Sequence, residues 1–315
     1  MRVLVVGASG AIGNRLVPQL IDHGHEVTGT FRSAASAEKV RALGARPLAL
    51  DALDADAVRT LVLEVKPEAI IHQATALANV RFSRSLDRTF AATNRLRTEG
   101  TDALLAAAKQ AGVRRFVAQS FASYRYERAG GPVKTEDDPL DPAPPAAARA
   151  TNAAMRYLDD AVTSAGGIAL RYGGFYGASD DGLVALVRRR FYPVVGDGAG
   201  VSSFIHLDDA AAATVLALDH EGPGLYNIVD DEPSPMREWL PEVARIVGAR
   251  PPRHLPEWIA RLIAGQCMVV MATQSRGASN AKAKAELGWT PRYPSWREGF
   301  RAAYGQPTAA TTGQR

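Results

Sequence analysis

Three glycines near the start of the sequence, Gly7, Gly10 and Gly13, have the spacing of a turn that binds phosphate groups. They follow an apolar segment, residues 3–6, and precede a helical pattern of apolar side chains. The first glycine lets the chain turn tightly, the second lets backbone N–H groups approach a pyrophosphate, and the third lets the helix pack on the sheet. The sequence therefore predicts a dinucleotide site, the alternative being a tight turn that binds nothing. The predicted site comprises Gly7, Ser9, Gly10, Ala11, Ile12 and Gly13.

Further small and polar residues follow the other predicted strands. Asp51 and Ala52 come after the third strand, Gln73 and Ala74 after the fourth, and Ser120 after the fifth. The carboxyl ends of parallel strands share one edge of a sheet, and ligands bind outside that edge. We therefore expect these residues to lie beside the glycine turn. Asp51 has a second interpretation, as the N-cap of a helix that begins at Ala52.

The elements that must position these residues alternate between strands and helices, which is the pattern of a doubly wound, parallel α/β sheet. Apolar runs predict strands at 3–6, 26–30, 46–50, 69–72, 115–119, 168–171 and 225–229. Helices are expected at 100–109, 208–218, 236–247 and 255–263, while 173–206 looks rich in loops. We expect a nucleotide-binding domain over residues 1–170 and a smaller substrate domain over 171–305 that could interleave with it. Residues 306–315 should form a frayed tail.

The composition is that of an ordinary globular protein. The 315 residues include 37 basic and 33 acidic side chains, and the basic runs are short, which argues against a nucleic-acid groove. A single cysteine, Cys267, excludes an internal disulfide and suits a reducing cytoplasm. The longest apolar stretch, around residues 262–272, is too short to span a bilayer, and no secretory signal opens the chain. We therefore expect a cytoplasmic protein that binds neither nucleic acid nor membrane.

Eight short motifs occur in one order along nearly the whole chain. They are the glycine turn at 7–13, Asp51, residues 71–74, 115–120, 171–177 and 204–209, Tyr226-Asn227, and residues 287–289. In this order they resemble the extended short-chain dehydrogenase/reductase family, also called NAD-dependent epimerases/dehydratases. The resemblance implies a Rossmann-type nucleotide domain, a smaller C-terminal substrate domain, and an active site between them for a small-molecule substrate. It also implies that Asp51 contacts the adenine, that Ser120 binds the reacting oxygen, and that a homodimer could form through a helix pair.

The end of the second predicted strand bears on the choice of nicotinamide cofactor. Members of this family that prefer NAD place an acidic residue there, which holds the ribose 2′-hydroxyl. Residues 28–33 contain no carboxylate, and Arg32 could pair with a 2′-phosphate through its guanidinium. Arg15, in the first turn of the first helix, is a second candidate. We therefore predict NADP rather than NAD, the alternative being that Arg32 is an ordinary surface arginine.

The catalytic pair typical of the family is missing. Its members usually carry a Tyr followed four residues later by a Lys, and together these exchange a proton with the substrate oxygen. None of the six lysines has a Tyr four residues before it, and the expected segment, residues 146–152, contains neither residue type. Arg149 could keep a positive charge near the ribose, but it cannot supply a hydroxyl. The candidate proton donors are Ser120, Tyr124 and Tyr176, with Tyr126 and Tyr172 as further phenols that could equally be packing residues.

Two classes of function follow. The first is an NADP-dependent oxidoreductase acting on a small carbonyl or hydroxyl metabolite or a sugar-nucleotide, with Ser120 and a relocated tyrosine handling the proton. The second is a non-redox isomerase or lyase, or a cofactor-sensing protein, that keeps NADP(H) as a structural ligand. The complete nucleotide site favours the first, and the missing pair favours the second. His206 and Asp208–Asp209 have poor spacing for a metal site, so we expect them to be structural and expect no metal.

Overall fold

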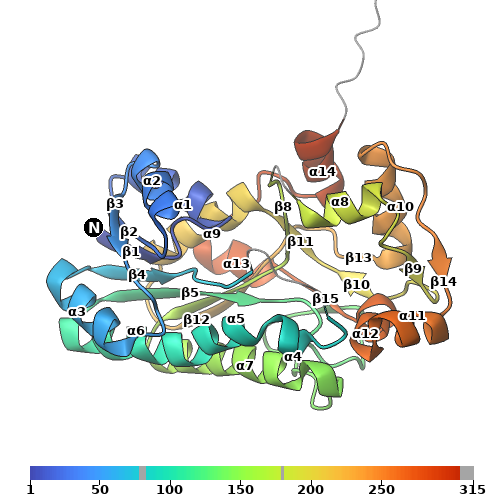
Figure 1. The fold of residues 1–315 in the computed structure, drawn as a ribbon, viewed down its shortest axis with the longest axis horizontal. Coiled ribbons are helices and arrows are strands. Elements are labelled where there is room, and N and C mark those ends of the chain that lie inside the picture. The colour runs from blue at the N-terminus through green and yellow to red at the C-terminus, as the bar shows by residue number, and fades with distance from the viewer. Residues whose placement is uncertain (78–82, 179–180, 306–315) are drawn as a thin grey trace, which may run out of the picture.

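The structure is a computed structural model that describes residues 1–77, 83–178 and 181–305. At its centre lies a seven-stranded sheet with the strand order β12-β7-β5-β4-β1-β2-β3 (Figure 1). These strands are β1 (Arg2–Val6), β2 (Glu26–Phe31), β3 (Arg46–Ala49), β4 (Ala69–His72), β5 (Arg115–Phe121), β7 (Ile168–Tyr172) and β12 (Gly224–Ile228). All neighbouring strands are parallel, so the predicted Rossmann-type α/β sheet is confirmed. The expected tail, 306–315, lies outside the described residues.

Strand β1 lies at the point where the order of the strands reverses. It pairs with β2 on one side and with β4 on the other. The chain builds the sheet outward from β1 through β2 to β3, then crosses over to β4 and extends the sheet in the other direction. At such a reversal the loops that follow the two strands separate and leave a crevice at their carboxyl ends. The glycine turn follows β1, and Gln73 and Ala74 follow β4. The topology therefore places these predicted site residues at the crevice.

Helices cover both faces of the sheet (Figure 1). On one face lie α1 (Gly13–Asp22), α2 (Ala34–Ala42) and α9 (Leu207–Asp219); on the other lie α3 (Ala55–Val65), α6 (Thr101–Ala111) and α7 (Arg149–Ser164). Side chains alternate along a strand, so Val3 and Val5 of β1 enter the first core while Leu4 and Val6 enter the second. Burial on both faces explains why the strands are continuous apolar runs in the sequence.

Shorter helical segments border the edge at which the strands end. α4 (Leu86–Thr89) and α5 (Ala91–Arg95) lead into a π-helical turn (Leu96–Gly100) that continues directly into α6. The sequence predicts a regular helix from residue 100, and no pattern in it indicates the π-helical turn. Such turns are rare and occur frequently at functional sites. A 3₁₀ turn (Ala146–Ala148) precedes α7.

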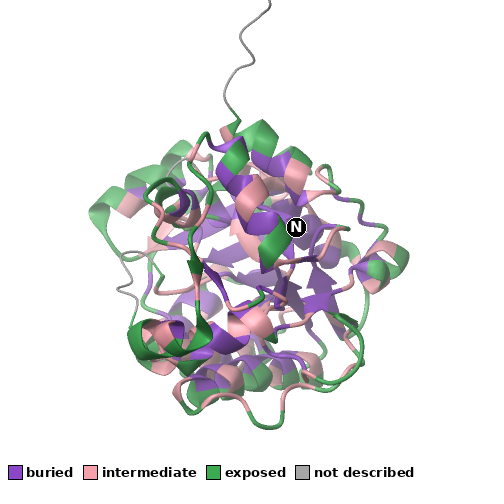
Figure 2. Ribbon diagram, turned by 90° about the vertical axis from the view of Figure 1, so that its right-hand side faces the viewer, coloured by how far each residue is buried: buried purple, intermediate pink, exposed green. Residues whose placement is uncertain are grey.

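The C-terminal region forms a further apolar core beside the sheet. Its helices are α8 (Gly182–Arg188), α10 (Met236–Ile246), α11 (Glu257–Ala264), α12 (Gln266–Thr273) and α14 (Trp296–Tyr304), whereas α13 (Ala281–Leu287) packs into the first core of the sheet. Figure 2 shows buried residues through the interior and exposed residues on the outer helices. Two-residue and three-residue strands pair between the segments: β6 (Val133–Lys134), β8 (Gly174–Tyr176), β9 (Val194–Val195), β10 (Val201–Ser202), β11 (Phe204–His206), β13 (Ser234–Pro235), β14 (His254–Leu255) and β15 (Gly277–Ala278). In the described ranges, no helix has the length and apolar character needed to cross a membrane.

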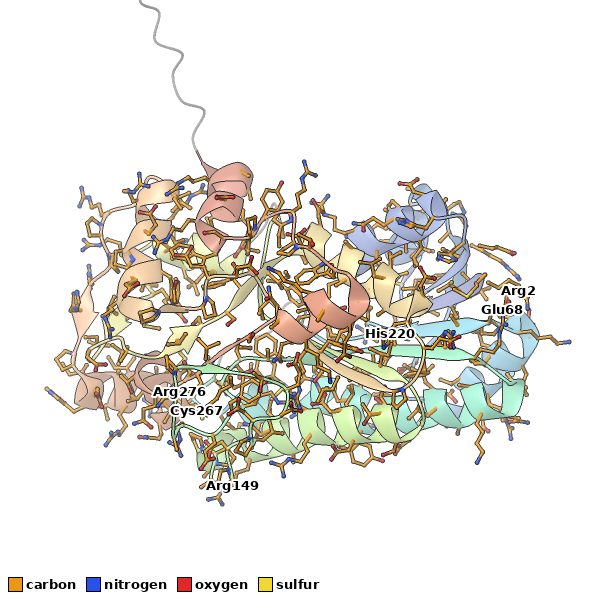
Figure 3. The ribbon with its side chains drawn as sticks, turned by 180° about the vertical axis from the view of Figure 1, so that it is seen from behind. Arg2, Glu68, Arg149, His220, Cys267 and Arg276 are labelled. Carbon is orange, nitrogen blue, oxygen red and sulfur yellow. The ribbon has the colours of Figure 1, made fainter. Side chains whose placement is uncertain are left out.

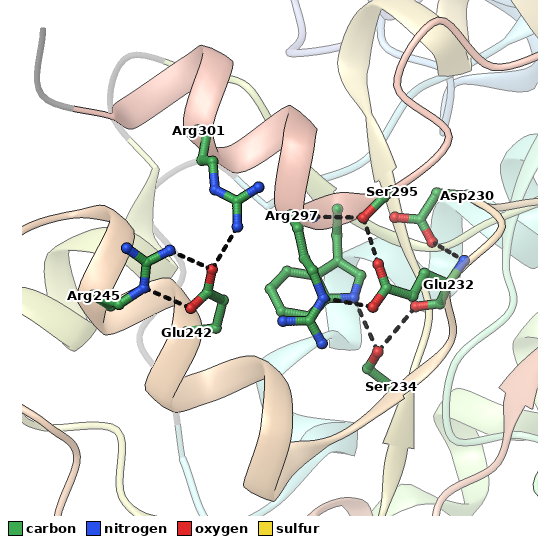
Figure 4. Close-up of polar contacts among 9 residues, drawn as sticks. Asp230, Glu232, Ser234, Glu242, Arg245, Ser295, Arg297 and Arg301 are labelled. Atoms are coloured by element: carbon green, nitrogen blue, oxygen red, sulfur yellow. Dashed lines mark hydrogen bonds and ion pairs between the residues drawn. The ribbon is translucent and has the colours of Figure 1, made fainter. Parts of the chain in front are cut away.

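An acidic turn, Asp230–Glu232, follows β12 and holds the start of α14 (Figure 4). The Glu232 carboxylate accepts hydrogen bonds from the Ser295 hydroxyl and, at 2.6 Å, from the Arg297 guanidinium. Asp230 is 1% exposed; its Oδ1 accepts the N–H of Glu232, whereas its Oδ2 has no partner among the residues described. Burial raises the pKa of Asp230 to about 8, and the nearby carboxylates of Glu232 and Asp231 add to this effect.

Candidate active site

In the glycine turn between β1 and α1, a side chain would collide with the backbone at two of the three glycines and would be less crowded at the third, Gly10. Gly7 has a φ of +97°, and a Cβ atom there would lie 2.8 Å from the backbone nitrogen of Ala74. A Cβ atom on Gly13 would lie 2.2 Å from the carbonyl oxygen of Ala8. On Gly10, which is exposed, the nearest described atom would be the carbonyl oxygen of Gly7, at 3.2 Å. Gly10 is therefore the least crowded of the three positions, and its exposure is compatible with the approach of a pyrophosphate to the backbone.

The remaining residues of the turn differ in exposure. Ala11 is exposed, Ser9 is half-buried, and Ile12 is buried in the core beneath α1. Ile12 can therefore meet a dinucleotide only through its backbone, whereas Ser9 and Ala11 lie at the surface of the turn.

The loop after β2 carries a positive charge and no carboxylate. Arg32 is exposed, and the next residue, Ser33, caps α2 by accepting a hydrogen bond from the N–H of Ser36. Arg15, the second candidate for a 2′-phosphate, lies elsewhere: its guanidinium is 3.3 Å from the Asp208 carboxylate. Of these two candidates, Arg32 is therefore the one at the end of β2.

Asp51 does not cap the helix that follows it. That helix, α3, begins at Ala55 and is capped by Asp54, whose carboxylate accepts the N–H of Ala57 at 3.0 Å. The carboxylate of Asp51 instead accepts the N–H of Leu53 at 3.0 Å, and Asp51 remains exposed at the end of β3, while Ala52 is buried. The interpretation of Asp51 as an N-cap is wrong because the chain makes one further turn before the helix begins.

Gln73 and Ala74 follow β4 at the crevice. The Gln73 side chain is buried and donates to the Tyr172 hydroxyl at 3.1 Å. That hydroxyl lies 2.6 Å from the Thr214 hydroxyl, and burial raises the pKa of Tyr172 to about 12. The Tyr172 hydroxyl is thus already hydrogen-bonded within a network that joins the end of β4, β7 and α9. Ala74 is half-buried and lies against the glycine turn.

Ser120 lies within β5, near its carboxyl end, with its hydroxyl in a buried ion-pair network. The guanidinium of Arg125 donates to the Ser120 hydroxyl at 3.1 Å and lies 2.7 Å from the Asp159 carboxylate. Arg171 approaches the same carboxylate oxygen at 2.9 Å. Ser120 and Arg125 are 1% exposed. Two guanidinium groups share one carboxylate here, so this group of side chains carries a net positive charge beneath the crevice.

Tyr124 follows β5 in a strained conformation. Its φ of +47° lies in the left-handed region, which large side chains rarely adopt and which is often found at functional sites. Its ring lies 5.3 Å from that of Phe121. Burial raises the pKa of Tyr124, although the positive charges of Arg97 and Arg125 oppose the rise. The phenol therefore keeps its proton at neutral pH and lies near two cations.

The other two candidate phenols are engaged elsewhere. Tyr126 donates to Asn227 at 2.6 Å and accepts from Arg171. Tyr176 is 1% exposed, and its ring stacks on that of Phe300, with the ring centres 4.5 Å apart. Its hydroxyl points toward α14, since a Cβ atom on Gly299 would lie 1.9 Å from it. The structure thus bonds Ser120 to Arg125, the residue that follows Tyr124, and places Tyr176 in the C-terminal core.

The first turn of α7, where the family's Tyr and Lys are expected, is held by a residue of α4. The Asp87 carboxylate accepts the backbone N–H of Ala150 at 3.1 Å, and the N–H and hydroxyl of Thr151 at 2.7 and 2.8 Å. Asp87 thereby replaces the cap that Ala148 cannot supply. Arg149 is exposed, and Figure 3 shows it at the outer edge of the molecule. It therefore brings no charge into the crevice.

Two residues that the sequence analysis did not single out complete the site. Arg97, on the π-helical turn, is half-buried near Tyr124; burial lowers the pKa of its guanidinium, and Arg125 adds to that shift. Its segment, Asn-Arg-Leu-Arg, has the composition of a solvent-exposed helix, so the sequence does not indicate that Arg97 is half-buried. The sequence could have indicated Asp159, because this acid falls between Met155 and Val162 on the apolar stripe of α7, where a buried carboxylate needs a partner.

His206, Asp208 and Asp209 make contacts within the fold. The His206 ring accepts the N–H of Asp208 at 3.1 Å and so caps α9. Burial lowers the pKa of His206, which favours the neutral ring that can accept this bond. Asp209 accepts the N–H groups of Arg292 and Tyr293 at 2.7 and 3.0 Å. These contacts tie α9 to the segment that leads to α14.

Comparison with known proteins agrees with this architecture. Residues 3–229 match the model of the NAD dependent epimerase/dehydratase family. A 3-diazoavenalumate denitrifying reductase from a Streptomyces species is 44% identical over 308 residues, which cover 95% of this chain and 99% of the relative. The UDP-glucose 4-epimerase of Thermus thermophilus, solved in complex with NAD, is 28% identical with a TM-score of 0.72, covering 96% of this chain and 98% of that one.

A second solved structure has the same fold at lower identity. The UDP-glucose 4-epimerase of Thermotoga maritima, solved with UDP-glucose, has a TM-score of 0.78 at 22% identity and covers 96% of this chain and 97% of its own. The glycine turn, the strand order and the matched family model lead to one conclusion. This chain belongs to the NAD-dependent epimerase/dehydratase family of extended short-chain dehydrogenases/reductases.

Proposed function

We propose that this protein is an NADP(H)-dependent reductase that delivers a hydride to the diazo group of an aromatic substrate. One observation carries the proposal: the glycine turn of the nucleotide site is exposed at Gly10, yet residues 146–152 contain no Tyr and no Lys. The Streptomyces reductase at 44% identity, whose name states a diazo substrate and a loss of nitrogen, supports the choice of hydride acceptor.

A diazonium group and a carbonyl group make different demands on a protein. A carbonyl oxygen gains negative charge as hydride adds to its carbon, so it needs a proton donor or an oxyanion site. A diazonium group begins with a positive charge and loses it when hydride adds to the terminal nitrogen, so no proton is required. The resulting aryldiazene loses its N–H proton and dinitrogen, and the aryl carbon takes a proton from solvent, so the diazonium ion and one hydride give the arene and dinitrogen. Such an acceptor removes the need for the Tyr and Lys pair.

The residues of the chain would bind and orient the reactants. NADPH, when bound, supplies the hydride. The backbone before Gly10 would hold the pyrophosphate, and Arg32 would pair with the 2′-phosphate. Ser120 and Asp159 act through Arg125, because they fix its guanidinium and with it the turn that carries Tyr124. We regard Ser120 as a positioning residue for this reason.

Ketone reduction is the second candidate. The observation that favours it is Tyr124, a protonated phenol near the cations Arg97 and Arg125, since such a phenol could donate to a developing alkoxide. The two candidates predict different roles for the Tyr124 hydroxyl, which a ketone requires and a diazonium group does not.

The test is to mix the purified protein with NADPH and with a benzenediazonium salt. We expect loss of the 340 nm absorbance above the rate without enzyme, and one equivalent each of dinitrogen and benzene. Gly10→Val serves as the control that abolishes cofactor binding. The proposal is overturned if benzenediazonium gives no rate above that control, and ketone reduction replaces it if acetophenone is reduced instead.

A further inference from the structure

Helix α11 presents its large apolar side chains to the outside of the molecule. At 3.6 residues per turn, Ala260 lies on one side of this helix and four larger side chains lie on the other: Trp258, Ile259, Leu262 and Ile263. Ala260 is buried in the C-terminal core. The exposed fractions are 69% for Trp258, 65% for Leu262 and 60% for Ile263, although a surface helix normally turns its apolar side to the core. We call these three exposed side chains the apolar face of α11.

The most exposed apolar side chains of the described residues gather at one end of the molecule. Seven large apolar side chains are exposed there, and three of them form the apolar face of α11. A fourth, Phe191 at 70%, lies just before β9, and β9 pairs with β14, the strand that leads into α11. Figure 1 shows β9, β14 and α11 together, on the right. The other three are at most 42% exposed: Leu77, Val133 and Tyr157. Such a concentration is typical of a surface that binds a protein or a membrane.

Three arginines border the apolar face of α11. Arg261 belongs to the helix itself, and Arg253 comes just before it in the chain. The guanidinium of Arg84 donates to the carbonyl oxygen of Ile263, in the last turn of α11, at 3.0 Å. All three arginines are exposed, and none of them forms an ion pair among the residues that the structure describes. The acid of α11 is Glu257, in its first turn, so the charge around the apolar face is net positive.

The positive border distinguishes between two occupants of this face. In a two-fold contact between two copies of the chain, the same surface meets itself, so the arginines of both copies would be brought together. An anionic lipid surface instead offers phosphate groups to the arginines and an apolar layer to the apolar face. A tryptophan such as Trp258 is also a side chain enriched at the depth where the two layers meet. The charges therefore favour a lipid surface over a second copy.

We propose that α11 binds the surface of an anionic lipid bilayer and lies in the plane of that surface. The apolar face enters the boundary between headgroups and acyl chains, while the three arginines contact lipid phosphates. The apolar segment here is too short to cross a bilayer, which was the ground for expecting no membrane binding from the sequence. A helix that lies on the surface needs no such length. The proposal does not depend on the proposed reaction, because binding is measured without cofactor or substrate.

The test is sedimentation of the full chain with lipid vesicles. One set consists of phosphatidylcholine alone, and the other of equal parts of phosphatidylcholine and phosphatidylglycerol. We expect binding to the anionic set, weakening as the salt concentration rises, and little binding to the neutral set. Tryptophan fluorescence reports the site of contact, because the three other tryptophans are at most 2% exposed: Trp239, Trp289 and Trp296. A blue shift on adding anionic vesicles therefore reports Trp258.

Single substitutions separate the apolar and the charged contributions. Leu262→Ser should weaken binding about tenfold or more, because it removes an apolar side chain from the acyl boundary. Arg261→Gln should weaken it about fivefold, the contribution of one cation near an anionic surface. The matched controls lie outside the face and should bind like the wild type: Val133→Ser, at an exposed apolar position of β6, and Arg59→Gln, at an exposed arginine of α3. Trp258→Phe should keep most of the binding and lose the blue shift.

Binding that is lost in Leu262→Ser and kept in Val133→Ser supports the proposal. It is overturned if the wild type binds anionic vesicles no better than neutral ones, if Trp258 emission does not shift, or if Leu262→Ser binds normally. Equal losses in Arg261→Gln and Arg59→Gln would show an effect of overall charge alone and would also overturn it. Sedimentation velocity without lipid detects the other occupant: a wild-type dimer that Leu262→Ser converts to a monomer would assign the face to a second copy. The substituted side chains are exposed, and thermal unfolding reports whether each variant is folded.

Discussion

The buried carboxyl group of Asp230 should make the protein less stable as the pH rises. Its pKa in the folded protein is about 8, against an ordinary value of 3.8. Burial is the main cause, and the carboxylates of Glu232 and Asp231 add to it. Because the folded-state pKa is raised, the stabilising contribution is complete below the ordinary pKa and is lost as the pH rises toward 8.

The size of the effect follows from the two pKa values. Between pH 5 and pH 7 the carboxyl of the unfolded chain is ionised and that of the folded chain is protonated, so folding takes up one proton. The free energy of unfolding should then fall by about 1.4 kcal/mol per pH unit, or about 2.7 kcal/mol over the interval. Asp230→Asn removes the titration and keeps the shape, so its stability relative to the wild type should rise by this amount.

Urea unfolding of both proteins at pH 5, 6 and 7 measures the difference. A constant offset between them reflects the amide itself, so only the slope of the difference against pH is diagnostic. Asp22→Asn, at an exposed position near the end of α1, is the matched substitution against which the slope for Asp230→Asn is compared. A flat difference for Asp230→Asn would refute the inference that this carboxyl is protonated in the folded protein.

Three further predictions concern the crevice. Gly10→Val should abolish NADP binding in calorimetry while the protein still folds, because a branched side chain there occupies the space where the pyrophosphate must approach the backbone; normal binding would place the pyrophosphate elsewhere. Arg32→Ala should weaken NADP at least tenfold, about 1.4 kcal/mol, and leave NAD unchanged, whereas equal losses for both would contradict a 2′-phosphate contact. Tyr124→Phe should change kcat for a diazonium substrate less than about threefold; a loss of about a hundredfold is the range of general acid catalysis and would indicate ketone-type chemistry.

The sequence predicted the sheet well because both of its faces are buried. The predicted and observed bounds agree to within a residue or two in all seven strands, and the strand at 69–72 agrees at both ends. A strand covered by helices on both sides must be apolar along its length, and this pattern can be recognised without knowing which helices cover the strand. The glycine turn could also be predicted, because a side chain at Gly7 or Gly13 would collide with nearby backbone atoms, and this requirement is visible in the glycine spacing.

The surroundings of the candidate proton donors could not be predicted from the sequence, because they depend on contacts between distant segments. Sequence order suggested Tyr176 as a proton donor, yet its hydroxyl points toward α14, more than a hundred residues further along the chain. Ser120 was placed correctly at the end of its strand, but the arginine that engages its hydroxyl is held by Asp159 of α7. The π-helical turn at Arg97 has no sequence pattern at all, since it results from how α5 and α6 join.

The hold that Asp87 exerts on α7 limits what substitutions at the start of that helix can do. Because α4 fixes the first turn of α7 and Arg149 is exposed, a lysine substituted at position 149 would extend into water. A tyrosine and a lysine introduced among residues 146–152 would therefore take their directions from a backbone that Asp87 sets, and redirecting them would require the turn itself to be rebuilt.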